Sequence, residues 1–358
     1  MYQISRKGKD LKGKINISGS KSESNRLLIL RAYTSYFNIL NISDSDDTKT
    51  VMDALESNNE EINIGHAGTA MRFLTSYYSS ISNSKKILTG SSRMKNRPIS
   101  LLVEALNELG CDIEYIDKIG YPPIKINGKL ISKTTVSLPA NISSQYISSL
   151  MMLGISLENG LKIKLSTKIT SLPYILMTKR IIERIGGSVQ INSNYIIIQQ
   201  LKSKNITDQN VESDWSSASY FFSLAALSNY CDITLSTFFK KSIQGDSKLV
   251  EIYKKLGVKT VFKENKIHLK KKKIKLPDKI SINLKDNPDL AQTIVITCLG
   301  LGVDCTLSGL HTLKIKETDR LLALKKEIEK FDVDSVKITE ESIELRNSSN
   351  LKSEICID

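Results

Sequence analysis

The sequence has few of the features that mark membrane, secreted or metal-binding proteins. No stretch approaches the run of about 18 apolar residues that a membrane-spanning helix needs, and the first residues lack the apolar core of a secretory signal. The five cysteines stand singly, without a C-x-x-C pair, which indicates reduced thiols in the cytoplasm and excludes a disulfide framework. The three histidines lie far apart in sequence, so we expect no metal site.

Aromatic residues are also scarce, at 6%, and they are not interleaved with basic residues as in a surface that stacks nucleotide bases. Lysine and arginine outnumber aspartate and glutamate by 51 to 38, which gives a net charge of +13. Part of this excess lies in solvated lysine runs such as residues 270–273. We therefore expect small anions as partners, and neither nucleic acid nor a membrane.

Repeated helix–strand blocks are present along the chain, whose 358 residues are too many for one ordinary core and indicate two domains. Three amphipathic helices end at Gly110, Gly186 and Gly257, which are spaced 76 and 71 residues apart, and a strand follows each. Glycine is favoured there because the left-handed conformation that ends a helix costs it little. Residues 321–331 resemble a fourth copy, with Asp332 in place of the glycine.

A second kind of helix lies between these copies. It opens with small polar residues, continues as an almost wholly apolar helix and leads into a strand. The copies are residues 20–33, 67–78, 143–155, 216–227 and 289–301. Helices that are apolar on all sides are buried, so we expect these at the domain centres with converging N-termini. The alternation of helices and short strands predicts an α/β fold.

Three segments combine small or hydroxyl residues, a cation and a helix start: residues 19–26, 65–72 and 314–320. Free backbone N–H groups, the positive end of the helix dipole and a Lys or Arg together attract an anion. Three such segments in one chain indicate a ligand, or ligands, with several anionic groups.

These segments, together with residues 88–98, 143–145 and 214–220, resemble the EPSP synthase family. The motif Lys316-Glu-Thr-Asp-Arg320 and the glycine motif of residues 65–72 carry most of the likeness. The resemblance implies an α/β fold of two similar domains built from βαβαββ repeats, with the ligands in a cleft between them. We place the first domain at residues 1–18 plus 213–358 and the second at residues 19–212.

The resemblance also implies a sixth central helix and further cations for phosphoenolpyruvate, which would follow Asp358. We therefore expect the first domain to be incomplete at its C-terminus, with five of the six repeats' central helices. By the same reasoning, we expect residues 1–358 by themselves to be inactive.

The activity that the resemblance implies is a transfer in the shikimate pathway of aromatic amino acid biosynthesis. The enolpyruvyl group of phosphoenolpyruvate moves to the 5-hydroxyl of shikimate 3-phosphate, and phosphate is released. The methylene carbon of phosphoenolpyruvate must be protonated and the hydroxyl must lose a proton, so the reaction needs acid and base groups and cations for the substrates. It implies no cofactor, and we expect a cytoplasmic monomer.

Asp289, Glu317 and Lys21 take part in the proton transfers, by the same resemblance. From its sequence alone Asp289 is also a typical helix N-cap. Lys316 and Arg320 lie beside Glu317, and such cations lower the pKa of a carboxyl, which opposes an acid role unless bound anions offset them. Which of the three groups performs each step stays open.

The resemblance assigns the remaining site residues to the two substrates. The residues expected to bind shikimate 3-phosphate are Lys21, Ser22, Arg26, Ser143, Ser144, Gln145, Ser171, Tyr174, Asp289, Thr312 and Lys316. The residues expected to bind phosphoenolpyruvate are Lys21, Gly68, Arg97, Gln145 and Arg320. Arginine suits this because its planar fork grips a carboxylate or phosphate, and glycine because it lets backbone N–H groups approach the anion.

Two other functions compete with this one. The related UDP-N-acetylglucosamine enolpyruvyl transferases carry a loop cysteine near residues 91–95 and an asparagine after the N-terminal lysine. This chain has Ser22 after Lys21 and no cysteine before Cys111. The second alternative is a basic nucleic-acid-binding protein of related repeat fold, which predicts strongly salt-dependent binding. One departure from the EPSP synthase pattern is His66, where the family usually has asparagine.

Overall fold

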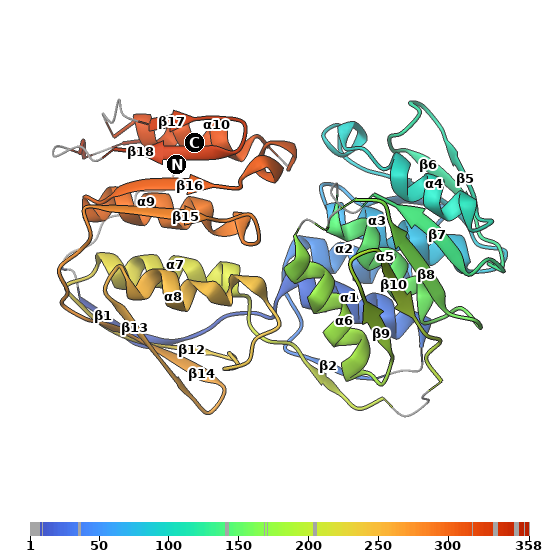
Figure 1. The fold of residues 1–358 in the computed structure, drawn as a ribbon, viewed down its shortest axis with the longest axis horizontal. Coiled ribbons are helices and arrows are strands. Elements are labelled where there is room, and N and C mark those ends of the chain that lie inside the picture. The colour runs from blue at the N-terminus through green and yellow to red at the C-terminus, as the bar shows by residue number, and fades with distance from the viewer. Residues whose placement is uncertain are drawn as a thin grey trace. The chain divides into compact units, whose positions relative to one another are not determined.

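The computed structural model describes most of the chain: residues 8, 10–34, 37–139, 143–167, 169, 171–202, 206–316, 318–331, 336–346, 351–353 and 355–357. The chain divides into two compact units, which we call domain 1 (Met1–Ile17 and Glu212–Asp358) and domain 2 (Ser18–Val211) (Figure 1). Both crossings lie one residue before the expected positions.

Local contacts explain where the chain passes from one domain to the other. The Ser213 hydroxyl donates to the Ile17 carbonyl oxygen at 2.6 Å, and this bond joins the two segments of domain 1 where the chain leaves it and returns to it. On the other side, a Cβ at Gly19 would lie 1.8 Å from the carbonyl oxygen of Asn41 and 2.8 Å from a methyl of Val211. Glycine therefore allows the chain to enter domain 2 in close contact with that backbone.

Domain 2 contains two four-stranded sheets and a two-stranded one, with strand orders β3-β4-β6-β5, β7-β8-β10-β9 and β11-β2. The strands are β2 (Ile39–Leu40), β3 (Glu61–Asn63), β4 (Lys85–Thr89), β5 (Asp112–Tyr115), β6 (Ile124–Asn127), β7 (Thr135–Leu138), β8 (Leu161–Leu165), β9 (Val189–Ile191), β10 (Tyr195–Ile198) and β11 (Gln209–Asn210). The helices are α1 (Lys21–Tyr33), α2 (Asp46–Glu56), α3 (Gly68–Ser80), α4 (Ser100–Glu108), α5 (Ser144–Gly154) and α6 (Leu172–Arg184).

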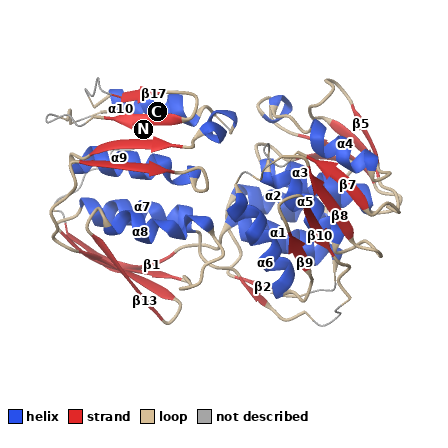
Figure 2. Cartoon of the chain, viewed as in Figure 1, coloured by secondary structure: helices blue, strands red, loops and turns tan. Residues whose placement is uncertain are grey.

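Domain 1 contains two four-stranded sheets, with orders β1-β12-β14-β13 and β15-β16-β18-β17. The strands are β1 (Asp10–Asn16), β12 (Tyr230–Ser236), β13 (Val258–Lys263), β14 (Lys266–Lys271), β15 (Lys279–Asn283), β16 (Asp304–Ser308), β17 (Val336–Ile338) and β18 (Ser342–Leu345). The helices are α7 (Trp215–Leu227), α8 (Leu249–Lys254), α9 (Ala291–Leu301) and α10 (Arg320–Glu329). Helices α7 and α9 pack on each other between the sheets, α7 on β12 and β14 and α9 on β16 (Figure 2).

Each four-stranded sheet repeats one topology. Its first two strands pair in parallel, as β3 with β4 and β15 with β16, and a terminal hairpin pairs antiparallel with the second strand. Parallel neighbours need a crossover, and α3 and α9 supply it in these two sheets. The predicted α/β fold of βαβαββ repeats is confirmed.

The predicted glycine helix ends also have the expected conformation. Gly110, Gly186 and Gly257 have φ angles of 101°, 94° and 84°, in the region that favours glycine. In the fourth copy the helix is α10, and Asp332 lies outside the described residues.

The second kind of helix is present in five copies, α1, α3, α5, α7 and α9, but its predicted burial is only partly right. In α1, residues 23–30 are all buried. Helix α7, in contrast, exposes Tyr220 by 58% and Leu224 by 43%. The described neighbours of α7, which include α8, α9, β12, β13 and β14, leave these two side chains uncovered, whereas Trp215 of the same helix is fully buried. None of the described helices is long and apolar enough to cross a membrane.

Candidate active site

The predicted site residues fall into two groups, one in each domain. In domain 2 they lie at the starts of α1, α3, α5 and α6, except that Arg26 lies in the second turn of α1 and Arg97 directly follows the 3-10 helix Met94–Asn96. The first turns of α3 and α5 are in contact, because the Gln145 side chain donates to the Thr69 hydroxyl at 3.4 Å. The predicted convergence of helix N-termini is therefore present between these two helices.

Lys21 begins α1, directly after the N-cap Ser20. Its ammonium group lies 2.8 Å from the Asp47 carboxylate, in the first turn of α2. The Lys21 side chain remains 42% exposed, so solvent or a ligand can reach it. The ion pair connects the start of α1, which the sequence singled out, with the start of α2.

Arg26 lies one turn further along α1 and is only 2% exposed. Its guanidinium donates to the Thr178 hydroxyl at 2.7 Å, the Ser22 carbonyl at 2.7 Å and the Ser148 hydroxyl at 3.2 Å. Burial lowers the pKa of Arg26 to about 10, so the group still carries its charge at neutral pH. This cation connects α1 with α5 and α6.

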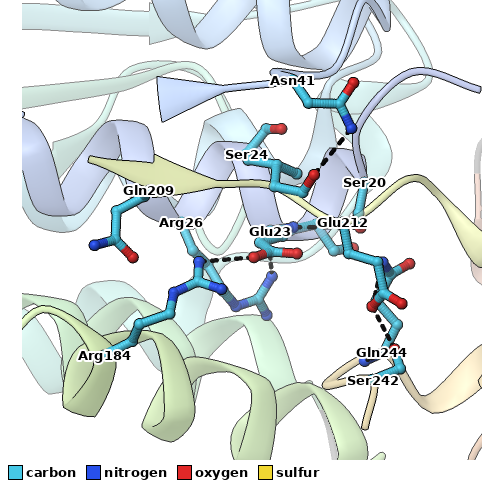
Figure 3. Close-up of polar contacts among 12 residues, drawn as sticks. Ser20, Glu23, Ser24, Arg26, Asn41, Arg184, Gln209, Glu212, Ser242 and Gln244 are labelled. Carbon is cyan, nitrogen blue, oxygen red and sulfur yellow. Dashed lines mark hydrogen bonds and ion pairs between the residues drawn. The ribbon is translucent and has the colours of Figure 1, made fainter. Parts of the chain in front are cut away.

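A second charged contact on α1 was not predicted from the sequence. The carboxylate of Glu23 is fully buried and accepts from the Arg184 guanidinium at 2.7 Å, at the end of α6 (Figure 3). Glu23 and Arg184 are 161 residues apart, so no local pattern could pair them.

Gly68 and Arg97 are in direct contact. A Cβ built at Gly68 would lie 2.5 Å from Nη1 of Arg97 and 2.9 Å from its Cζ, so the guanidinium covers the first turn of α3. The missing side chain of Gly68 thus makes room for Arg97, and its expected role towards phosphoenolpyruvate stays a prediction. The contact brings that cation to a helix N-terminus, where backbone N–H groups point outwards.

Arg72 stabilises the contact between Gly68 and Arg97 through hydrogen bonds to both segments. It is 4% exposed and donates to the Gly68 carbonyl at 3.2 Å and to the Pro98 carbonyl at 3.0 Å. Burial lowers its pKa to about 10, with Arg97 contributing in the same direction. Arg72 thus ties the α3 turn to the loop that carries Arg97. His66 lies beside this loop, and its Nδ1 is 2.9 Å from the Ser91 hydroxyl.

The serines of α5 and α6 have distinct local roles. Ser143 is the N-cap of α5, since its hydroxyl accepts from the Gln145 backbone N–H at 3.3 Å. Ser144 is 8% exposed. Ser171 precedes α6 with a φ of 54°, a conformation that is uncommon for serine, and Tyr174 follows in the first turn of α6.

In domain 1 the predicted residues Asp289, Lys316 and Arg320 are brought together. The Asp289 carboxylate accepts from the Arg320 guanidinium at 2.7 Å and lies 3.6 Å from the Lys316 ammonium. The three side chains are between 20% and 26% exposed. Asp289 belongs to a 3-10 turn, Pro288–Leu290, and the N-cap of α9 is Leu290 without a side-chain bond. The N-cap interpretation of Asp289 is therefore wrong.

Two other predicted residues lie near this cluster in sequence. Thr312 belongs to the 3-10 helix His311–Ile315, which packs on the Asp289 turn, and its buried hydroxyl has no hydrogen-bond partner among the described residues. Glu317 lies outside the described residues. Asp319 is the N-cap of α10, because its carboxylate accepts from the Leu322 backbone N–H.

Sequence reasoning missed two buried carboxyls in domain 1. Glu212 is 1% exposed and accepts from Trp215 Nε1 at 2.9 Å, from the Phe239 backbone N–H at 2.8 Å and from Ser242 and Gln244 (Figure 3). Asp246 is 6% exposed, and burial raises its pKa to about 7, with Asp289 as the second cause. Only the Q-G-D sequence of residues 244–246 before a helix marks this position.

No cluster of three or more metal-ligating side chains occurs among the residues that the structure describes. The predicted cleft between the domains stays a prediction. Each domain by itself presents a set of polar groups suited to anions, and domain 1 adds carboxylates suited to proton transfer.

Comparisons with known proteins point in one direction. Residues 5–57 and 54–356 match the family model of "EPSP synthase (3-phosphoshikimate 1-carboxyvinyltransferase)". The chain is 44% identical over 322 residues to the 3-phosphoshikimate 1-carboxyvinyltransferase of Bacteroides fragilis strain YCH46, which covers 90% of this chain and 78% of the relative. The enzyme of the same name from Colwellia psychrerythraea is 33% identical over 355 residues, which cover 91% of this chain and 82% of that one.

A solved structure of EPSP synthase from Acinetobacter baumannii resembles the fold, with a TM-score of 0.70 over 95% of this chain and 83% of that one. At 20% sequence identity this likeness supports the fold alone.

Proposed function

The chain belongs to the EPSP synthase (3-phosphoshikimate 1-carboxyvinyltransferase) family, and we propose that the two groups of residues described above bind its substrates and transfer its protons. The reaction transfers the enolpyruvyl group of phosphoenolpyruvate to the 5-hydroxyl of shikimate 3-phosphate and releases phosphate. It belongs to the shikimate pathway of aromatic amino acid biosynthesis. The UDP-N-acetylglucosamine alternative is not favoured, because the matching relatives carry the EPSP synthase name.

In this proposal, shikimate 3-phosphate binds to domain 2 at the starts of α1, α5 and α6. Lys21 is exposed and already oriented by Asp47, while Arg26 supplies a fixed positive charge behind the serines. Ser22, Ser143, Ser144, Ser171 and Tyr174 supply the hydroxyls, and Gln145 lies between this set and α3. From domain 1, Thr312, Lys316 and Asp289 complete the set. The buried Thr312 hydroxyl has no hydrogen-bond partner among the described residues, which supports a role towards a ligand.

Phosphoenolpyruvate binds, in the same proposal, to Gly68 and Arg97 at the first turn of α3 and to Arg320, Lys21 and Gln145. The contact of Arg97 with Gly68 supports this, because it places a guanidinium beside the free N–H groups of a helix start. Two arginines can hold a carboxylate and a phosphate through paired hydrogen bonds.

Asp289 is the proposed base towards the 5-hydroxyl. In the free protein its carboxylate accepts from the Arg320 guanidinium at 2.7 Å and lies 3.6 Å from the Lys316 ammonium. In this proposal the bound anions draw the two cations towards themselves, which leaves the carboxylate free to accept the hydroxyl proton. Glu317 and Lys21 remain the partners for the proton at the methylene carbon.

The observation that carries this proposal is the cluster of Asp289, Lys316 and Arg320, in which one carboxylate and two cations meet from separate segments. The test is phosphate release by the purified full-length protein with both substrates. We expect turnover with shikimate 3-phosphate, none with UDP-N-acetylglucosamine as acceptor, and no tight binding of polynucleotides at 0.15 M salt. Turnover with UDP-N-acetylglucosamine instead would contradict the proposal.

We also propose that the protein acts as a cytoplasmic monomer without a metal. Activity that survives dialysis against EDTA, and a monomeric mass in sedimentation, are the expected results. Loss of activity in EDTA that returns with a divalent cation would contradict the metal-free reaction.

A further inference from the structure

Asp246 is a buried acid to which the reaction above assigns no role. It belongs to the short 3-10 helix Gly245–Lys248 that leads into α8, and it is 6% exposed. An aspartate is seldom buried unless its oxygens are hydrogen-bonded or paired. The hydrogen-bond partners of Asp246 therefore indicate its role.

Both carboxyl oxygens of Asp246 have partners, and these come from two different elements. The Ser216 hydroxyl, in the first turn of α7, donates to Oδ2. The Asn287 side chain donates to Oδ1 at 3.3 Å, and Asn287 is the residue directly before the turn Pro288–Leu290. One carboxyl thus connects the start of α7 with the turn that carries Asp289.

The charged groups around Asp246 are mostly of its own sign. Asp289, on the turn Pro288–Leu290, and Asp214, the N-cap of α7, both raise its pKa, while the bonds from Ser216 and Asn287 lower it. The cations Lys316 and Arg320, from the segment that leads into α10, are paired with Asp289. Burial is the largest influence, and it brings the pKa of Asp246 to about 7.

We propose that Asp246 is a positioning residue for Asp289: it fixes the 287–290 turn against α7, and its own proton responds to the charge on Asp289. This inference rests on the proposed role of Asp289 as the base. With Asp246 neutral, the turn is held by hydrogen bonds without a second negative charge beside Asp289. With Asp246 ionised, the two carboxylates repel each other, and the anionic substrates meet a more negative site.

The experiment compares Asp246→Asn with Asp246→Ala, and Asp278→Asn serves as a matched control on an exposed aspartate of the same domain. Asparagine keeps the shape and can bond to both Ser216 and Asn287, but it cannot ionise. We expect Asp246→Asn to keep kcat within about threefold of wild type at pH 6, and Asp246→Ala to lose at least tenfold.

The pH profile separates positioning from a merely structural role. For the wild type, kcat/KM for shikimate 3-phosphate should fall above pH about 7, where Asp246 ionises. Asp246→Asn should lack that fall, and the control should retain it. Substrate phosphates titrate in this range too, but equally for all the variants, so the difference between profiles reports Asp246. Identical profiles for wild type and Asp246→Asn would overturn the proposal.

A stability measurement tests whether Asp246 is protonated in the folded protein, and it does not depend on turnover. The pKa of Asp246 is raised in the folded state, from 3.8 to about 7, so the folded protein binds the extra proton between these values. Its contribution to stability is present at low pH and is lost as pH rises towards 7. The urea midpoint of wild type should therefore fall relative to that of Asp246→Asn between pH 4.5 and 7.5.

Parallel midpoints for the two proteins would show that Asp246 is already ionised, and the proposal would be wrong. If Asp246→Ala does not fold, Ser216→Ala takes its place, since it removes one of the two bonds and keeps the carboxyl. If the wild type shows no turnover but the stability difference is present, the proposed function is wrong. The conclusion that Asp246 is protonated in the folded protein would still hold.

Discussion

The two domains differ in the charged groups that they bury, apart from the carboxylate of Glu23, which domain 2 buries in an ion pair with Arg184. Domain 2 buries the guanidinium groups of Arg26 and Arg72 and surrounds them with hydroxyl and carbonyl oxygens. Domain 1 buries the carboxyls of Glu212 and Asp246, and it surrounds them with N–H and O–H donors. The difference fits the proposed roles, in which domain 2 supplies most of the groups that bind shikimate 3-phosphate and domain 1 supplies Asp289 as the base.

The strongest test of this comparison is the base in domain 1. Asp289→Asn keeps the shape of the side chain but removes its basicity, and we expect kcat to fall by about 10²–10⁴. The affinity for shikimate 3-phosphate, measured by calorimetry, should change little, because in this scheme domain 2 supplies most of its contacts. Asp286→Asn, an exposed neighbour, is the control. Near-normal turnover of Asp289→Asn would show that its carboxylate serves only the ion pairs.

The corresponding test in domain 2 is Arg26→Lys. Lysine retains the charge but cannot reproduce the three hydrogen bonds to Ser22, Ser148 and Thr178. We expect the free energy of unfolding to fall by about 2–3 kcal/mol, because hydrogen bonds to a buried charge are lost. Denaturant unfolding measures this, and the exposed Arg93→Lys should stay within about 0.5 kcal/mol of wild type. An unchanged stability for Arg26→Lys would mean that its bonds do not hold the helices together.

Gly68→Ala tests whether domain 2 binds phosphoenolpyruvate through Arg97. The added methyl would meet the Arg97 guanidinium at 2.5 Å, so this cation must move away from the helix start. We expect KM for phosphoenolpyruvate to rise about tenfold, equivalent to about 1.4 kcal/mol, with a smaller change in kcat. Gly13→Ala, in a strand of domain 1 with nothing within 4 Å of the added atom, is the control. An unchanged KM would show that Arg97 does not bind phosphoenolpyruvate.

The smallest effect compares equivalent glycines in the two domains. Gly110→Ala in domain 2 meets no atom within 4 Å, so only the φ of 101° opposes it, at a cost of about 1 kcal/mol. Gly257→Ala in domain 1 has a φ of 84° and would also bring its Cβ 2.9 Å from the Lys272 carbonyl oxygen. We therefore expect the larger loss of stability for Gly257→Ala in thermal unfolding. Equal losses would show that the backbone conformation alone decides the cost.

The fold was predictable because its signals are local. A small polar residue before an apolar run marks the start of α1, α5 and α7, and the glycines mark the ends of the outer helices. The site was predictable only in part. A family resemblance implied that Asp289 and Arg320 bind the substrates, but their ion pair was not predicted, and the structure corrected the N-cap interpretation of Asp289.

The parts that could not be predicted are those that depend on distant contacts. Glu23 finds Arg184 across 161 residues, and Asp246 finds Asn287 across 41. In a sequence each of these reads as an ordinary surface charge, because burial is set by the packing of whole helices. The exposed side of α7 escaped prediction for the same reason, since its apolar residues look alike whether or not an element covers them.

The pairing of β1 with β12 has a consequence for how the protein is made. β1 (Asp10–Asn16) is translated first, but its parallel partner β12 (Tyr230–Ser236) follows only after the whole of domain 2. At about 5–20 residues per second, on the order of 10–40 s pass before the partner leaves the ribosome. During that time the nascent strand has an open edge that can pair with another chain. Lys12 and Lys14 are exposed in the folded sheet, and their like charges would keep neighbouring nascent chains apart until β12 arrives.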